Sequence, residues 1–208
     1  MKNGIKNICI FCSSSNLLDE AYYKDAEILG RLLAENNYDI VYGGSKLGIM
    51  YKVSKTAKEF GSKITGVMPE KLYALCGNED FCNEFYLTDG MRERKAKLDE
   101  KSDAVIALAG GFGTLEELSE MIVQKQLCYN NKPIIILNTN GFYNHLLKFF
   151  DTIISENFAN INAKKLYFVA NSPIEAINYL KNYTFEKTNF GKEELLKHAG
   201  WKRKNINF

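Results

Sequence analysis

The chain has 208 residues, of which 46% are apolar and 25% are charged, and its formal net charge is +2. These values are typical of a soluble globular protein with one domain of ordinary size. No stretch approaches the ~18 consecutive apolar residues of a membrane span, which excludes an integral helical membrane protein.

The start of the chain and the cysteines both indicate the compartment. Residues 1–6 lead into a strand pattern rather than a signal peptide, so we expect a cytoplasmic protein. Five cysteines without a framework spacing predict free thiols. Cys9 and Cys12 form a C-x-x-C, but their odd separation on a predicted strand points them to opposite faces. The two histidines lie far apart in the sequence, and we expect neither a metal site nor a cofactor.

Short apolar runs alternate with amphipathic segments along the chain, and these predict strands and helices respectively. The expected strands are residues 5–12, 38–42, 63–68, 84–88, 103–108, 132–138 and 166–170. The expected helices are residues 19–36, one opened by Gly48, 91–101, 115–126, 142–156 and one that starts at Pro173. Residues 70–82 have the least regular pattern, and we interpret them as a cover over the site.

This alternation predicts the fold class. Since most strands are apolar throughout, we expect an α/β fold, a doubly wound, Rossmann-like parallel sheet of about seven strands with helices on both faces. The domain would span residues 1–182, and 183–208 would be a basic C-terminal extension, because 181–208 hold seven Lys or Arg and three Glu. A basic tail can contact RNA but is more often a solvated end, so we do not expect nucleic-acid binding.

Small and polar residues follow three of the predicted strands. These are Ser13–Ser15, Gly43–Gly44, and the run Gly110-Gly-Phe-Gly-Thr114. A junction between a strand and a helix presents free backbone N–H groups and the positive end of a helix dipole, which suits an anion. In a parallel sheet such turns share the carboxyl edge, where ligands bind. The run is neither a Walker A loop nor a dinucleotide fingerprint, since no Lys follows Gly113 and Glu116 stands where a glycine is required.

The carboxylates beside this run allow two interpretations. Thr114 followed by Glu117 matches a capping box, in which each side chain satisfies a backbone N–H at the start of a helix. Alternatively, Glu116 and Glu117 stand next to a phosphate cradle, an arrangement that suggests chemistry on a phosphorylated substrate. The sequence spacing favours neither.

A second group of charges lies on the predicted helix 91–101. Met91, Arg94, Lys95 and Leu98 share one face of it by helical spacing. Arg94 therefore sits among apolar neighbours and needs an anionic partner. That partner is either a protein carboxylate such as Glu84 or a ligand phosphate, which a guanidinium grips with two hydrogen bonds.

These motifs together resemble the LOG ("Lonely guy") family of cytokinin riboside 5′-monophosphate phosphoribohydrolases, often mislabelled as lysine decarboxylases. Its pattern is M-x-x-R-K, here residues 91–95, followed by P-G-G-x-G-T-x-x-E, here residues 109–117. The resemblance covers roughly residues 5–182 and includes the turns after the first two strands. Ala109 replaces the proline of the pattern, and Val123-Gln124 replaces the Thr-Trp of plant members.

The resemblance implies roles for individual residues. Arg94 and Glu117 would be catalytic, with Glu117 facing the ribose. The substrate would be bound by Ser13, Gly43, Gly44, Glu84, Lys95, Gly110, Gly111, Phe112, Gly113, Thr114 and Glu116. Among these, residues 110–114 would hold the 5′-phosphate, Glu116 a ribose hydroxyl, and Glu84 would lie near the base.

The implied activity is hydrolysis of the N-glycosidic bond of a nucleoside 5′-monophosphate, such as AMP or a cytokinin riboside monophosphate, to free base and ribose 5-phosphate. The family also implies a homodimer or a larger even oligomer. The alternative is a carrier of the same superfamily that binds a nucleotide or cofactor without cleaving it. Lysine decarboxylation is disfavoured, because it needs an electron sink such as PLP and no lysine has a convincing Schiff-base context.

Overall fold

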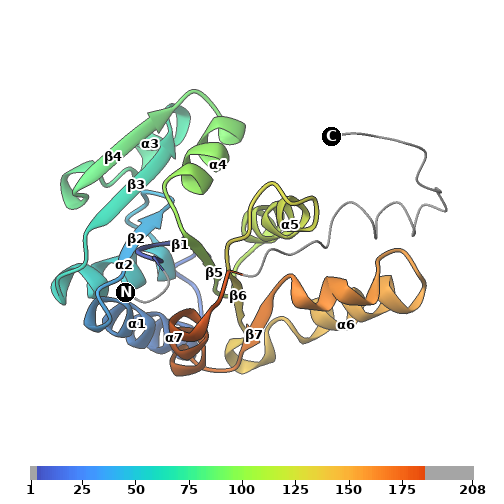
Figure 1. Cartoon of the computed structure of the whole chain (residues 1–208). Coiled ribbons are helices and arrows are strands. Elements are labelled where there is room, and N and C mark those ends of the chain that lie inside the picture. Colours follow the sequence, from blue (N-terminus) through green and yellow to red (C-terminus); the bar gives the residue numbers. More distant parts are fainter. Residues whose placement is uncertain (1–3, 186–208) are drawn as a thin grey trace.

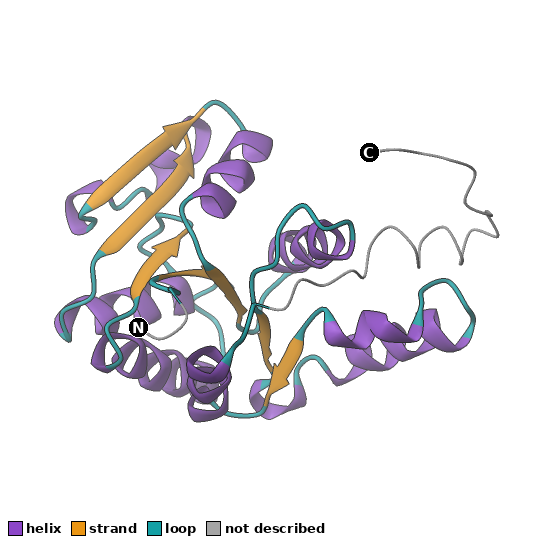
Figure 2. Ribbon diagram, in the orientation of Figure 1, coloured by secondary structure: helices purple, strands orange, loops and turns teal. Residues whose placement is uncertain are grey.

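The computed structural model describes residues 4–185 as a sheet flanked by helices (Figures 1 and 2). Of the basic extension predicted for residues 183–208, the part from residue 186 onward lies outside the described residues. The strands are β1 Asn7–Phe11, β2 Asp39–Tyr42, β3 Ile64–Pro69, β4 Glu84–Thr88, β5 Ala104–Ala107, β6 Ile134–Leu137 and β7 Phe168–Ala170. The helices are α1 Glu20–Glu35, α2 Gly48–Glu59, α3 Glu70–Cys76, α4 Met91–Glu100, α5 Phe112–Gln126, α6 Asn144–Ser155 and α7 Pro173–Asn182, with 3₁₀ turns η1 Glu79–Phe81, η2 Thr139–Gly141 and η3 Ile161–Lys165.

The seven strands form one sheet in the order β4-β3-β2-β1-β5-β6-β7, and every pairing is parallel. The central strand β1 pairs Ile8 with Ile40 of β2 on one side and with Ala104 of β5 on the other. The predicted doubly wound α/β fold is therefore confirmed. No helix among residues 4–185 has the length and apolar character needed to cross a bilayer.

Side chains that alternate along β1 divide the interior into two cores. Ile8, Ile10 and Cys12 face a cluster built with α1, α2 and α7. Cys9 and Phe11 face a cluster built with α4, α5 and α6, and Figure 1 shows these two groups of helices on opposite sides of the sheet. None of the five cysteines, all of which lie within residues 4–185, forms a disulfide, and Cys9 and Cys12 point to opposite faces as predicted.

Two expectations about local structure were wrong. Residues 70–82 are more regular than predicted, because Glu70–Cys76 form α3 and Glu79–Phe81 form a 3₁₀ turn. Helix α5 begins at Phe112 rather than at Leu115, so the last glycine of the run, Gly113, is helical. The apolar periodicity begins only at Leu115, so it does not mark the first helical turn.

The order of strands fixes where a ligand can bind. The chain builds β2, β3 and β4 on one side of β1 and then returns to build β5, β6 and β7 on the other. At the boundary between β1 and β5, consecutive connections leave in opposite directions and open a crevice at the carboxyl ends of the strands. The serine turn and the glycine run follow β1 and β5 respectively, so both lie at this boundary.

Candidate active site

A buried ion pair lies at the centre of the site. Arg94 on α4 donates from Nη1 to Oε1 of Glu117 on α5 at 2.6 Å, and both side chains are only 9% exposed. Arg94 also donates from Nε to the carbonyl of Val67 on β3 at 3.2 Å. The anion that Arg94 requires is therefore Glu117, and the predicted alternative, Glu84, is not its partner.

Gly43 makes room for this arginine. A Cβ on Gly43 would lie 2.4 Å from Nη2 of Arg94 and 2.9 Å from Sδ of Met50, so no larger residue fits without displacing them. Because Gly43 has no side chain, the guanidinium of Arg94 and the thioether of Met50 can pack directly against its backbone. Gly44, with φ +74°, packs against Phe85 in the same way and does not line the site.

Burial determines the acidity of the central carboxyl. Loss of solvation raises the pKa of Glu117 above its ordinary value, and the Arg94 guanidinium opposes this rise. A carboxylate with a raised pKa is a stronger base than an exposed one. The site therefore combines a basic carboxylate with a cation that holds it in one orientation.

The turns after β1 and β5 are joined to each other. The N–H of Ser13 donates to the carbonyl of Ala109 at 3.2 Å, and the N–H of Met50 donates to the carbonyl of Ser13 at the same distance. Gly48 opens α2 with φ +58°, and a Cβ there would lie 2.6 Å from the backbone of Ser14 and Ser15. A glycine is therefore required where the start of α2 approaches the serine turn.

The start of α5 shows that Thr114 and Glu117 are not a capping box. Gly111 is the N-cap residue and no side chain caps the helix, while Thr114 lies inside the first turn against Gly110. Glu117 binds Arg94 instead of a backbone N–H. The first turn of a 15-residue helix thus presents N–H groups and its dipole toward the site.

These elements enclose a cleft of about 360 Å³. It is lined by Cys12, Ser13, Ser14, Ser15, Met50, Met91, Arg94, Gly111, Gly113, Thr114 and Glu117. Six of the predicted site residues are brought together here: Ser13, Arg94, Gly111, Gly113, Thr114 and Glu117. The cleft lining also includes Met50 and Met91, which the sequence analysis did not predict as site residues. The position of Met91, three residues before Arg94 on the same helical face, could have indicated that it lies at the site.

The other predicted site residues lie outside the cleft lining. Lys95 binds Glu116 at 2.5 Å and Glu120 at 2.6 Å, which raises the pKa of Lys95. Phe112 projects into solvent with 93% of its surface exposed. Glu84 accepts from the Tyr86 hydroxyl at 2.7 Å, and it begins β4, so it lies at the amino edge of the sheet, opposite the cleft.

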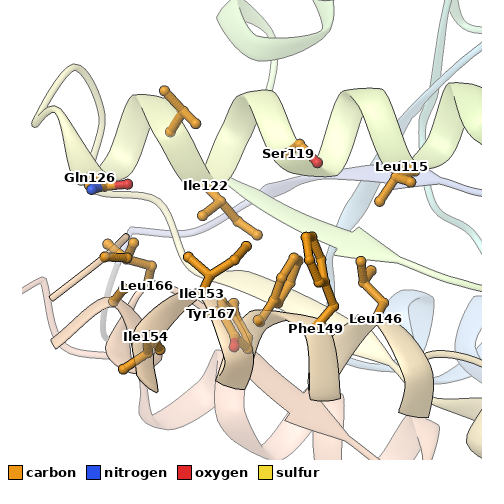
Figure 3. A pocket seen from close by; sticks show the side chains of 14 residues that line it. Leu115, Ser119, Ile122, Gln126, Leu146, Phe149, Ile153, Ile154, Leu166 and Tyr167 are labelled. Carbon is orange, nitrogen blue, oxygen red and sulfur yellow. The ribbon is translucent and has the colours of Figure 1, made fainter. Parts of the chain in front are cut away.

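Within residues 4–185, no group of three His, Cys, Asp or Glu residues is arranged to hold a metal ion. A second cavity of about 350 Å³ lies between α5 and α6. Figure 3 shows Leu115 and Ile122 of α5 facing Phe149 and Ile153 of α6 across it. We call this cavity the α5–α6 groove; its apolar lining offers no charged group for chemistry.

Comparison with known proteins decides the family. A family model described as "Possible lysine decarboxylase" matches residues 50–180. Cytokinin riboside 5′-monophosphate phosphoribohydrolase LOG1 of Arabidopsis thaliana is 39% identical over 184 residues, which cover 88% of this chain and 86% of that protein. The probable phosphoribohydrolase LOGL2 of Oryza sativa subsp. japonica is 37% identical, over 88% of this chain and 75% of the relative. This chain belongs to the LOG family.

Solved structures share the fold of this chain. The molybdenum cofactor carrier protein of Chlamydomonas reinhardtii has a TM-score of 0.66 at 24% identity and covers 85% of this chain and 96% of its own. A molybdenum cofactor binding protein of Rippkaea orientalis has a TM-score of 0.64 at 25% identity, with the same shares covered. These likenesses agree with the Rossmann-like sheet. The family resemblance predicted from the two motifs is confirmed by the sequence relatives.

Proposed function

We propose that this LOG protein hydrolyses the N-glycosidic bond of a nucleoside 5′-monophosphate, which consumes water and releases the free base and ribose 5-phosphate. The observation that carries the proposal is the buried Arg94–Glu117 pair in the wall of a cleft bounded by the serine turn and the first turn of α5. The similar plant proteins are named for this reaction on cytokinin riboside 5′-monophosphate.

The chemistry of the bond accounts for the carboxylate. Breaking an N-glycosidic bond develops positive charge on the ribose, as in glycoside hydrolysis. Glu117 would stabilise this charge and accept a proton from the attacking water, a task to which its raised pKa is suited. Arg94 would fix the orientation of Glu117, because Val67 and Glu117 hold its guanidinium in place.

The phosphate would lie between the two turns. Gly111, Gly113 and Thr114 from the start of α5 line the same cleft as the serine turn. An anion there gains from unpaired N–H groups and from the dipole of α5. We therefore assign substrate binding to the lining residues Ser13, Gly111, Gly113 and Thr114, and we leave Glu84, Lys95 and Glu116 out of it.

The family model's description, lysine decarboxylase, fits this site poorly. Among residues 4–185, none of those that line the cleft is a lysine, whereas a PLP Schiff base requires one. Lys95 is paired with two carboxylates, and Lys125 is buried near the far end of α5. The donors present suit a phosphorylated sugar better than a cofactor aldehyde.

The decisive experiment compares AMP with adenosine and measures the released base. If the cleft holds a 5′-phosphate, AMP should be cleaved and adenosine should not. Equal rates for the two would contradict the phosphate site. Binding of AMP without release of adenine would instead indicate a carrier, the role for which the Chlamydomonas reinhardtii protein is named.

We also propose a homodimer that uses the α5–α6 groove. Apolar side chains surround this groove, with Phe149 58% and Val123 49% exposed, and an apolar patch of this kind marks an interaction site. A groove beside protruding side chains can be self-complementary about a two-fold axis. Helix α5 contributes to both the groove and the cleft, so a partner here would brace the helix that carries Glu117.

A further inference from the structure

The two walls of the cleft differ in chemistry. One wall consists of the serine turn, which carries hydroxyls, and the first turn of α5, whose helix start offers backbone N–H groups. The other presents the thioether side chains of Met50 and Met91. The Arg94–Glu117 pair lines the same cleft. A phosphate suits the first wall, so the second is available to a different part of the same ligand.

The packing places both methionines beside Arg94. Met50 Sδ and Arg94 Nη2 are the two nearest atoms above Gly43, which puts the thioether next to the guanidinium. Met91 begins α4, three residues before Arg94 and on the same face of the helix. Met50 is tied to the serine turn through its backbone N–H, so its side chain starts from a fixed position.

Met91 has no structural reason to face the cleft. Met91 belongs to neither core cluster and is 45% exposed. A polar residue at this exposed position could start α4 equally well, because it would not bury a charge. Methionine side chains are flexible and polarisable, and they pack well against aromatic rings. Met50 and Met91 are the apolar part of the cleft lining beside Arg94.

We infer that Met50 and Met91 form the seat for the base of the nucleotide, beside the Arg94–Glu117 pair. This inference rests on the proposed function, because it takes the ribose to lie at Glu117. Among the described residues that line the cleft, none carries an amide, and the one carboxylate is paired with Arg94. The base is therefore recognised by contact with its faces rather than through hydrogen bonds to its edges.

This mode of recognition predicts broad use of purines. Apolar contact separates similar ligands by only ~10- to 200-fold, whereas a site built for hydrogen bonds rejects the wrong ligand by ~10⁴-fold or more. The ratio of kcat/KM for AMP over GMP should therefore stay below about 200-fold. A larger ratio in the unmodified protein overturns the seat, because it indicates polar readout of the base.

Calorimetric titration of a cleavage-deficient protein, Glu117→Gln, tests the seat directly with two ligands. AMP carries the base, and ribose 5-phosphate lacks it. Adding Met91→Ala should weaken AMP binding by ~5- to 10-fold, as expected for the loss of part of one apolar side chain, and should leave ribose 5-phosphate binding within ~2-fold. Met91→Leu, of similar volume, should keep most of the AMP affinity.

The matched control is Ile174→Ala, an exposed apolar residue in the first turn of α7, which should change neither affinity. Equal weakening of both ligands by Met91→Ala, or no weakening of AMP, overturns the seat. Release of base from AMP by the unmodified protein is measured separately. If no base is released but AMP binding still depends on Met91, the hydrolysis proposal fails and the seat stands.

Discussion

Glu117 is the residue on which the proposed chemistry depends, and Glu117→Gln keeps its shape and an acceptor for Arg94. Turnover of AMP should fall by a factor on the order of 10²–10³, because the developing ribosyl charge loses its counter-ion. The free energy of unfolding should fall by only about 1–3 kcal/mol, since a hydrogen bond to Arg94 can persist. Single-turnover base release and denaturant unfolding measure the two effects.

Glu120→Gln is the matched control, because Glu120 lies one turn further along α5 and pairs with Lys95 outside the cleft. It removes the same charge and should leave turnover within ~2-fold, since surface ion pairs contribute little. A Glu117→Gln protein that cleaves AMP near the parent rate would remove this carboxylate from the mechanism.

The raised pKa of Glu117 also predicts a pH dependence. The carboxylate of Glu117 takes up its proton at a higher pH in the folded protein than in the unfolded chain, where the ordinary glutamate pKa is 4.5. The contribution to stability is therefore fully present below pH 4.5 and is lost as the pH rises through the raised pKa. Activity changes in the opposite direction, because the base must be deprotonated, so kcat/KM should show an acid limb with a pKa above 4.5. An acid limb at or below the ordinary glutamate value would contradict this.

Gly43 offers a test of how closely the site is packed. Gly43→Ala places a Cβ 2.4 Å from Nη2 of Arg94, so the guanidinium must move and its contact with Glu117 must change. We expect turnover to fall by at least about 10²-fold, as is usual when a catalytic group is displaced by ~1 Å. Gly90→Ala is the control, because a Cβ there meets nothing within 4 Å. Similar activity losses in both variants would show a general backbone effect.

At the scale of elements, helix α5 links the cleft to a buried lysine near its other end. Lys125 is 2% exposed and donates to the carbonyl of Lys132 at 2.9 Å and to the hydroxyl of Tyr183 at 3.1 Å. Burial lowers its pKa from 10.5 to about 8. Between about pH 8 and pH 10.5 the Lys125 amine is therefore protonated to a greater extent in the unfolded chain than in the folded protein.

Because folding lowers the pKa of Lys125, the contribution of Lys125 to the free energy of unfolding should increase as the pH rises. Below the folded pKa of about 8 the full penalty for burying the charge is present, and it is relieved as the pH rises toward 10.5. The free energy of unfolding should gain up to ~1.4 kcal/mol per pH unit in this window. Lys125→Met should remove this gain, whereas Lys148→Met, at an exposed position on α6, should keep it. Denaturant titrations between these pH values measure it; an unchanged slope in Lys125→Met would contradict the assignment.

At the scale of the whole molecule, the α5–α6 groove predicts the assembly. Light scattering at micromolar concentration should give a dimer or a larger even oligomer for the parent protein. Phe149→Glu places a charge at the rim of the groove, where the side chain is 58% exposed, and should give a monomer that remains folded. Phe60→Glu, at an exposed position at the end of α2, is the control and should keep the oligomer. A monomeric parent contradicts the dimer, and a dimeric Phe149→Glu variant contradicts the groove.

The sequence by itself determined the sheet, because apolar runs that alternate with amphipathic segments can be buried only between two layers of helices. It also identified the glycine junctions and the demand of Arg94 for an anion, since both follow from local chemistry. The M-x-x-R-K and glycine motifs were enough to indicate the LOG family, which the relatives confirm.

Only the tertiary structure decided which residues meet. The sequence named Glu84 or a ligand phosphate as the partner of Arg94. Glu84 begins its strand at the amino edge of the sheet, whereas the actual partner, Glu117, follows β5 at the carboxyl edge. The same contact explains why Glu117 is not part of a capping box. The methionine wall and the α5–α6 groove arise between elements distant in sequence, from side chains whose local patterns predict only helical faces. Periodicity reports which face of a helix is apolar, whereas the partner of that face depends on the order of strands in the sheet.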